Sequence, residues 1–336
     1  MTKFIKEAIL FAIPILLFFA ITVGTFFLFD PFKILNEYEV FNNSIVSYNE
    51  DYIATERFLK NKTQYNSFIL GSSRAGCGFR VSDWEKKLGN TAQVFSFAAS
   101  NESIFGIWGK VRLLDEENAP IDHVLLVIDT DITMKRTVNS NGHIFIKHPR
   151  VSGESETAFI SEYLKDYIFT GFFVRYLDYK MFEEERSYMK GFLNFAHKSL
   201  EEQYIPFNIN QREARILDDE AAYYQENTFY DRPAEAVSAK SFINSKSIGF
   251  MKDIKAIFDK HQTNYKIVIS PLYDQKKIHE LDLKAIQEIF AKENVFDYSG
   301  KNAITDDKHN YYETSHYRIG IGQQIINRIY DDLSKE

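Results

Sequence analysis

The sequence has 336 residues and a single cysteine, Cys77. One cysteine excludes a disulfide within the chain and a metal site built from several cysteines. The chain also lacks an excess of basic residues, because 40 Lys and Arg stand against 47 Asp and Glu, a net charge of −7. A protein with this balance has no general electrostatic attraction for nucleic acid. We therefore expect no nucleic-acid partner.

Motifs for metals and cofactors are missing as well. Gly320-Ile321-Gly322 lies within a helical pattern and does not follow a strand, so it does not predict a dinucleotide-binding loop. Several histidines lack metal-ligand spacing to a neighbouring Asp, Glu or Cys: His143, His148, His197, His261 and His309. We expect no cofactor and no metal.

The first feature present is a long apolar run near the N-terminus. Residues 8–29 carry no charge and are long enough for a helix to cross a membrane. Lys3 and Lys6 precede the run, so the positive-inside rule places residues 1–7 in the cytoplasm and the rest of the chain outside it, in the periplasm or at the cell surface. A cleaved signal peptide is the alternative, but no small-x-small cleavage site follows the run. The sequence predicts a single-pass signal-anchor.

The rest of the chain predicts an α/β fold, and its 45% hydrophobic content is sufficient for a large core. We expect residues 30–65 to form a stalk and an approach to the domain that follows, with a helix near 51–60. Helical stretches then alternate with apolar runs that predict five strands, near residues 67–71, 94–99, 124–128, 266–270 and 295–298. This alternation predicts a doubly wound, flavodoxin-like parallel sheet in a domain of residues 66–334. A largely helical insertion interrupts this domain at about 135–245.

Polar side chains follow three parts of this predicted sheet. Ser72 and Ser73 come directly after the first strand, where a strand-to-helix turn can present a hydroxyl. Asp129 and Asp131 follow the third strand, and Tyr311-Tyr312-Glu313-Thr314-Ser315-His316 precedes the last helix. Parallel sheets bind ligands at the carboxyl ends of their strands, so these groups can meet there. Serine, histidine and carboxylate together make a nucleophile, a base and an orienting acid.

The motifs resemble those of the SGNH (GDSL-like) hydrolase superfamily, in its membrane-anchored branch. That branch includes alginate O-acetylation proteins and the D-alanine transfer protein of teichoic acid modification. Gly71-Ser72-Ser73-Arg74 is similar to its first block, and Tyr312-Glu313-Thr314-Ser315-His316-Tyr317 to its Asp-x-x-His-Tyr last block. The resemblance implies that Ser73 is the nucleophile, with Ser72 as the fallback, that His316 is the general base and that Glu313 is the orienting acid.

Three positions depart from the pattern of this superfamily. Glu313 stands where aspartate is usual, and Asn101 falls where the second block has a glycine of the oxyanion hole. Asn101 could still donate through its backbone N–H or its amide. Asp129 replaces the asparagine of the third block, and its negative charge would repel a developing oxyanion. Arg74 is a further candidate for shaping the pocket.

The resemblance implies an acyltransferase or esterase that works through a seryl ester on cell-surface polysaccharide. A membrane-bound O-acyltransferase would then be the donor-side partner, and a glycan hydroxyl or water the acceptor. Two alternatives remain open. One is a non-catalytic SGNH-like scaffold or glycan-binding subunit of an envelope polysaccharide complex. The other is a Mg²⁺-dependent phosphatase of the haloacid-dehalogenase type, because Asp129-Thr130-Asp131-Ile132-Thr133 has the Asp-x-Asp-x-Thr form of its nucleophile motif.

Overall fold

The computed structural model describes residues 2–38, 45–193, 209–226 and 229–331. The chain forms two compact units. Unit 1 comprises Met1–Asn49, Asn141–Ile146 and Glu154–Leu200, and unit 2 comprises Glu50–Ser140, Lys147–Gly153 and Glu201–Glu336. The sheet and all the candidate site residues belong to unit 2.

Unit 2 is built on a five-stranded parallel sheet with the order β2-β1-β3-β5-β7. The strands are β1 (Ser67–Leu70), β2 (Val94–Ser96), β3 (His123–Ile128), β5 (Asn264–Ile269) and β7 (Val295–Asp297). Numbered along the chain, this order is the 2-1-3-4-5 order of flavodoxin-like folds. The predicted fold class is therefore confirmed.

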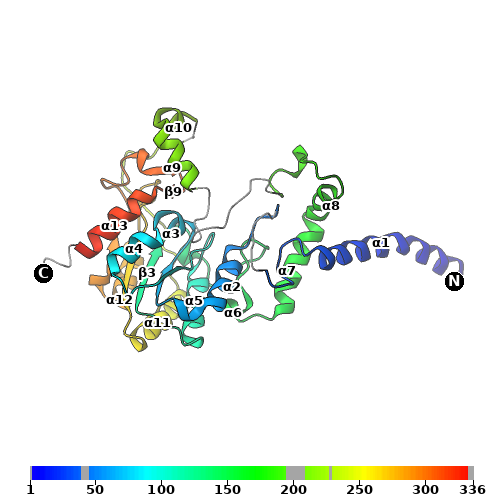
Figure 1. Ribbon diagram of the computed structural model, residues 1–336, viewed down its shortest axis with the longest axis horizontal. Coiled ribbons are helices and arrows are strands. Elements are labelled where there is room, and N and C mark those ends of the chain that lie inside the picture. Colours follow the sequence, from blue (N-terminus) through cyan, green and yellow to red (C-terminus); the bar gives the residue numbers. More distant parts are fainter. Residues whose placement is uncertain (1, 39–44, 194–208, 227–228, 332–336) are drawn as a thin grey trace. The chain divides into compact units, whose positions relative to one another are not determined.

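Helices cover both faces of this sheet, as alternate strand residues require. Phe68, Leu126 and Ile267 belong to one hydrophobic cluster, and Ile69 and Leu125 to another. The first cluster takes side chains from α2 (Glu50–Asn61), α5 (Ile104–Glu116), α11 (Ser245–Lys260) and α12 (Glu280–Phe290). The second takes them from α3 (Ser73–Gly78), α4 (Val81–Leu88) and α13 (Ile319–Asp331). Figure 1 shows these helices around the sheet.

Short elements complete the described chain. The strands β4 (Val237–Ser238) and β6 (Lys276–Lys277) pair in parallel, and β8 (Tyr311–Glu313) pairs with β9 (His316–Tyr317) as a hairpin. Helix α12 begins at Glu280, after the strand β6. Five 3-10 helices are η1 (Lys62–Gln64), η2 (Thr133–Lys135), η3 (Ser187–Met189), η4 (Lys292–Asn294) and η5 (Lys308–Asn310).

Each unit takes part of residues 30–65 and part of residues 135–245. Helix α2, placed in the approach, buries Ala54 and Phe58 in the core of unit 2 because these residues lie on its apolar face. The insertion contributes α7 (Glu156–Phe169) and α8 (Phe172–Phe182) to unit 1. It contributes α6 (Pro149–Ser152), α9 (Ile209–Asp218) and α10 (Glu220–Glu226) to unit 2. Residues 194–208, part of the expected insertion, lie outside the described residues.

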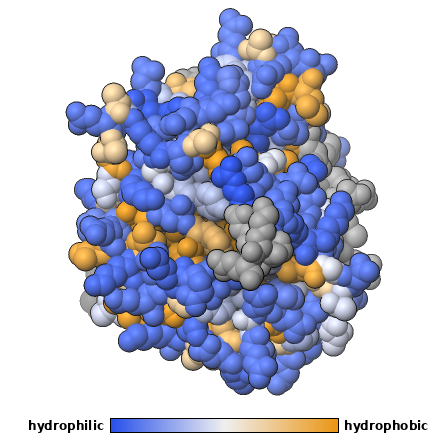
Figure 2. All heavy atoms as spheres, turned by 90° about the vertical axis from the view of Figure 1, so that its left-hand side faces the viewer, coloured by the Kyte–Doolittle hydropathy of each residue, from blue (hydrophilic) through white to orange (hydrophobic). Residues whose placement is uncertain are grey.

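Unit 1 begins with α1 (Thr2–Phe29), whose stretch Lys3–Phe29 is long and apolar enough to cross a membrane. Within this unit, α7 and α8 lie beside the C-terminal end of α1 (Figure 1). The remainder of α1 exposes apolar side chains, among them Leu10, Phe11 and Leu16. By contrast, the face of the molecule drawn in Figure 2 is mainly hydrophilic, with hydrophobic side chains gathered in limited patches.

Candidate active site

The turn that carries the two serines is shaped by Gly71. This residue has φ +152°, and a Cβ at its position would lie 2.8 Å from Ala75 Cβ and 2.9 Å from the carbonyl oxygen of Val127. Only glycine fits there, so β1 passes into α3 through Gly71 and Ser72 alone, and Ser73 is the first residue of the helix. The turn therefore delivers both serines to the carboxyl edge of the sheet.

The structure gives the two serines different roles. Ser72 is fully buried and is the N-cap of α3, where its Oγ accepts from the N–H of Arg74 (3.1 Å). The same hydroxyl donates to Oδ2 of Asp129. Ser73 is only partly buried, and its Oγ lies 2.9 Å from Nε2 of His316. Ser73 is thus the serine placed beside a base, and Ser72 is used in capping.

The base and the acid come from the hairpin β8–β9 and lie on either side of its turn. Glu313 and His316 are paired across the two strands, and Oε1 of Glu313 bonds to Nδ1 of His316. When Nδ1 carries the proton in this bond, Nε2 is left to accept from the Ser73 hydroxyl. Serine, imidazole and carboxylate are therefore connected in series, which is the arrangement of a nucleophile–base–acid triad.

The carboxylate of Glu313 is held in its charged form. Burial alone would raise the pKa of Glu313, but the hydrogen bond and charge of His316 lower it. The N–H of Ser315 donates to Oε2 of Glu313 at 2.7 Å, and Arg212 lies 4.0 Å from Oε1, and both contribute to the lower pKa. A charged carboxylate stabilises the imidazolium that forms when His316 takes a proton.

Arg74 ties the nucleophile turn to the hairpin. Its Nε donates to the carbonyl oxygen of Ser315 at 2.8 Å, in the turn between Glu313 and His316. Its two terminal nitrogens donate to the two carboxylate oxygens of Asp131, at 2.6 and 3.1 Å. The Arg74 side chain is 9% exposed, and it is bound to both of these partners. Arg74 therefore holds the spacing between the serine and the histidine.

The hairpin is also anchored by tyrosines of α10. The Tyr223 hydroxyl donates to the carbonyl oxygen of Tyr312 at 2.9 Å, and the Tyr224 hydroxyl to that of Tyr311 at 2.8 Å. On the other side, the Tyr311 hydroxyl donates to the carbonyl oxygen of Pro271, at the end of β5. Part of the insertion thus supports the strands that carry the base and the acid.

Asp129 is a buried carboxylate that lies beside Ser72 and Arg74. Its carboxylate is fully buried, accepts from Ser72 and lies 3.5 Å from Nη1 of Arg74. An ionised carboxylate has no proton to donate to an oxyanion. Among the described residues no hydrogen bond is donated by the Ser73 N–H, the first N–H of α3, so this group can donate to a developing oxyanion.

Asn101 occupies the loop after β2 in a conformation that glycine usually adopts, with φ +55°. When its amide is oriented with the oxygen toward Arg136, which satisfies both groups, this oxygen accepts at 2.8 and 3.1 Å from the two terminal nitrogens of that side chain. None of the polar contacts of Asn101 within the described residues reaches the serine, histidine and glutamate. The backbone geometry therefore matches the expected glycine position, whereas the side chain contacts Arg136.

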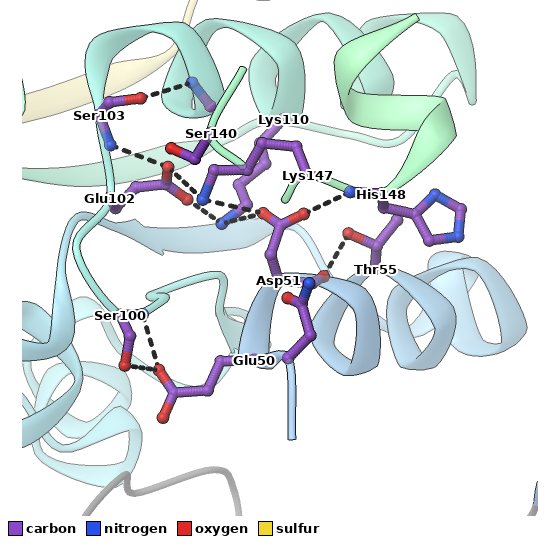
Figure 3. Close-up of polar contacts among 12 residues, drawn as sticks. Glu50, Asp51, Thr55, Ser100, Glu102, Ser103, Lys110, Ser140, Lys147 and His148 are labelled. Carbon is purple, nitrogen blue, oxygen red and sulfur yellow. Dashed lines mark hydrogen bonds and ion pairs between the residues drawn. The ribbon is translucent and has the colours of Figure 1, made fainter. Parts of the chain in front are cut away.

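The same loop is fixed by acidic side chains of α2 and by a buried group of charges (Figure 3). Glu50 accepts from both the N–H and the hydroxyl of Ser100, each at 2.7 Å. Beside them, the buried charge cluster consists of Asp51, Glu102, Lys110 and Lys147, whose side chains are at most 2% exposed. Two positive and two negative side chains offset one another there, and Glu102 ties the loop to the cluster.

The Asp-x-Asp motif does not fit a magnesium site. Asp131 is bound by Arg74 through both of its oxygens, and Asp129 is bound by Ser72 and lies near the same guanidinium. A cation between the two carboxylates would stand against that positive charge. Over the described part of the chain, no three Asp, Glu, His or Cys side chains come together as metal ligands.

Cys77 lies close to the site, but it is not activated. Burial raises the pKa of its thiol, and the charges of Glu50 and Glu313 raise it further. A thiol with a raised pKa stays protonated and is a poor nucleophile. Cys77 is therefore a packing residue of α3.

Sequence reasoning missed the tethering contacts of Arg74 and the charge cluster around Lys110. A signal for the second existed, since Lys110 lies one turn from Ile107 and Leu114 on the apolar face of α5. Comparison with known proteins adds no relative: no protein-family model matches the chain, and no curated protein matches it.

Proposed function

We propose that this chain is a membrane-anchored, serine-dependent O-acyltransferase or esterase, similar in its motifs to the SGNH superfamily. The observation that carries the proposal is the chain of contacts from Ser73 through His316 to Glu313, at the edge of a parallel sheet where such folds bind ligands. Its acceptor would be a hydroxyl of a cell-surface polysaccharide, or water.

The geometry supports a two-step reaction. Ser73 Oγ attacks the carbonyl carbon of an acyl donor while Nε2 of His316 takes the hydroxyl proton. The tetrahedral intermediate collapses, His316 returns the proton to the leaving group, and an ester on Ser73 remains. The acceptor hydroxyl then attacks this ester and gives its proton to His316, and Ser73 regains a proton as the product leaves. The N–H of Ser73 is the first donor to the oxyanion in both steps.

Placement at a membrane favours transfer to a glycan over hydrolysis. Helix α1 is long and apolar enough to act as an anchor, and Lys3 and Lys6 at its start favour a cytoplasmic N-terminus and an extracytoplasmic catalytic unit. An anchor holds the serine near a donor delivered by a membrane-bound O-acyltransferase and near nascent polysaccharide, which raises their effective concentration.

A non-catalytic scaffold or glycan-binding subunit is the second candidate. The observation in its favour is Asp129, a buried carboxylate at the position where an SGNH hydrolase is expected to offer an asparagine donor. The magnesium-dependent phosphatase is disfavoured, because Arg74 occupies the side of Asp129 and Asp131 that a cation would need.

Labelling of the full chain in detergent micelles with a fluorophosphonate serine probe tests the proposal. We expect labelling of the unaltered chain and of Ser72→Ala, no labelling of Ser73→Ala, and the same pattern for hydrolysis of p-nitrophenyl acetate with or without EDTA. Hydrolysis of p-nitrophenyl phosphate that needs Mg²⁺ and is lost in Asp129→Asn would establish the phosphatase instead. Absence of labelling and of turnover in the folded protein would favour the scaffold.

A further inference from the structure

The turn between α7 and α8, in unit 1, carries an uncharged apolar tip. Eight consecutive residues, Tyr167–Val174, lie between the charged residues Asp166 and Arg175. Phe169 is 75% exposed and Val174 is 55% exposed. Two large apolar side chains at the tip of a helical hairpin are costly to leave in water and point to an apolar partner.

This tip lies against the apolar helix α1. The ring of Phe173 contacts the ring of Phe18 with centroids 5.5 Å apart, and Tyr167 contacts Phe26 at the same distance. Further along α8, the ring of Tyr176 lies 6.3 Å from that of Phe29. The hairpin therefore reaches from the end of α1 back toward its middle.

The charges on α1 limit how this helix can sit in a bilayer. No charged residue lies between Glu7 and Asp30, and this run is about 33 Å long at 1.5 Å per residue. It barely exceeds the hydrocarbon core of about 30 Å, so the helix cannot slide far in either direction. Phe18 is then about 16 Å from Phe29, near the middle of the core. A ring in contact with Phe18 lies at the depth of the acyl chains.

Some polar groups of the turn are bonded within the hairpin. The N–H and the hydroxyl of Thr170 both donate to the carbonyl oxygen of Asp166, at 3.2 and 2.5 Å. Arg175 folds back, and its Nη1 donates to the carbonyl oxygen of Gly171 at 2.7 Å. Each polar group bonded in this way lowers the cost of placing the backbone away from water.

We propose that the hairpin tip Tyr167–Val174 inserts among the lipid acyl chains, in the leaflet that holds the C-terminal half of α1. The partner is the bilayer itself, and Phe169 and Val174 are the side chains that face the lipid. This inference rests on the membrane anchor in the proposed function but not on the chemistry of Ser73. With a second insertion point beside α1, unit 1 cannot rotate freely about the axis of the anchor.

Depth-dependent fluorescence quenching tests the insertion. Cys77 is first replaced by alanine in the full chain. One cysteine is then introduced at Phe169, Val174, Leu16 or Leu217 and labelled with an environment-sensitive fluorophore. Each labelled protein is reconstituted into phosphatidylcholine vesicles. Leu16, 65% exposed on α1, reports the anchor, and Leu217, 78% exposed on α9, is the matched apolar control in unit 2. Lipids with a nitroxide on the acyl chain should quench the labels at Phe169 and Val174 several-fold more than the label at Leu217. The labels at Phe169 and Val174 should also be shielded from quenching by iodide in the water.

Two results would overturn the proposal, and they have different meanings. If the label at Leu16 is quenched by the acyl-chain nitroxide while the label at Phe169 responds to iodide as strongly as that at Leu217, the anchor stands and the hairpin lies in water. If the label at Leu16 is itself open to iodide, both the anchor and the insertion fail. Hydrolysis of p-nitrophenyl acetate, measured on the same preparations, reports separately on the chemistry of Ser73.

Discussion

Replacement of Lys110 by methionine is expected to destabilise unit 2 strongly. Lys110 is fully buried, and its ammonium group donates to the carbonyl oxygen of Phe97 at 2.8 Å and to Glu102 (Figure 3). It also forms an ion pair with Asp51, 2.9 Å from Oδ1. The variant would leave two buried carboxylates with one cation, Lys147, which lies 3.8 Å from Asp51. The two negative charges would then no longer be balanced.

The magnitude follows from this burial. One unit charge 2.9 Å from another interacts by roughly 6 kcal/mol at an effective dielectric of about 20, but desolvation offsets part of that in the native protein. Breaking a buried pair by removal of one partner typically costs about 3–5 kcal/mol, and we expect a loss in this range for Lys110→Met. The control is Lys284→Met, since Lys284 is 71% exposed and lies 3.8 Å from Glu288, and such surface pairs contribute about 0–1 kcal/mol.

Urea denaturation followed by tryptophan fluorescence measures this loss in the correct unit. The only tryptophans of the sequence, Trp84 and Trp108, both lie in unit 2. The double variant Lys110→Met with Glu102→Gln should lose less stability than the sum of the two single variants, because it restores the balance of charge. A loss below about 1 kcal/mol for Lys110→Met, no larger than that of an exposed pair, would refute the reasoning.

Three further predictions concern pH, packing and catalysis. Burial would raise the pKa of Asp51, but its two lysine partners lower it to about 2. The stability that Asp51 contributes is therefore present above its ordinary pKa of 3.8 and is lost as the pH falls toward about 2. Acid unfolding of unit 2 should accordingly be less steep in Asp51→Asn. Gly78→Ala would place a Cβ 2.1 Å from the ring of Tyr317, next to the base, and should lower kcat for p-nitrophenyl acetate. The control is Gly249→Ala, whose added Cβ would have no atom within 4 Å. This variant should keep its kcat and gain up to about 1 kcal/mol of stability. Glu313→Gln should lower kcat at least about a hundredfold with little change in KM, because the orienting carboxylate charge is lost, and a wild-type kcat would contradict its role.

The fold could be predicted from the sequence because its strands are strongly patterned. The run Val124–Ile128 is apolar throughout, as a strand buried on both faces must be, and helical stretches separate it from the next strands. The weaker elements escaped prediction. Lys276–Lys277 forms a strand of two charged residues, and its pairing with β4 depends on a segment nearly forty residues away. No local pattern marks such a pair.

The sequence predicts which residues form the candidate site better than it predicts how they are arranged. The sequence indicated Ser73, Glu313 and His316, but a spacing of three residues predicts a helical turn as readily as the hairpin that is present. The choice between Ser72 and Ser73 depends on which hydroxyl the turn directs to Asp129, and Gly71 decides this through contacts with residues far along the chain. Such contacts are tertiary and leave no local signal.

Direct detection of an acyl group on Ser73 is the most direct test of the proposed function. The full chain, mixed with p-nitrophenyl acetate and quenched in acid before turnover is complete, would be cleaved with trypsin after Lys62 and Arg74, and the fragment 63–74 sequenced by mass spectrometry. We predict one acetyl group on Ser73, absent when Ser73 is replaced by alanine and slow to leave when His316 is replaced by glutamine. Acetate released at the normal rate by Ser73→Ala, or an acetyl group on Ser72 alone, would contradict the account.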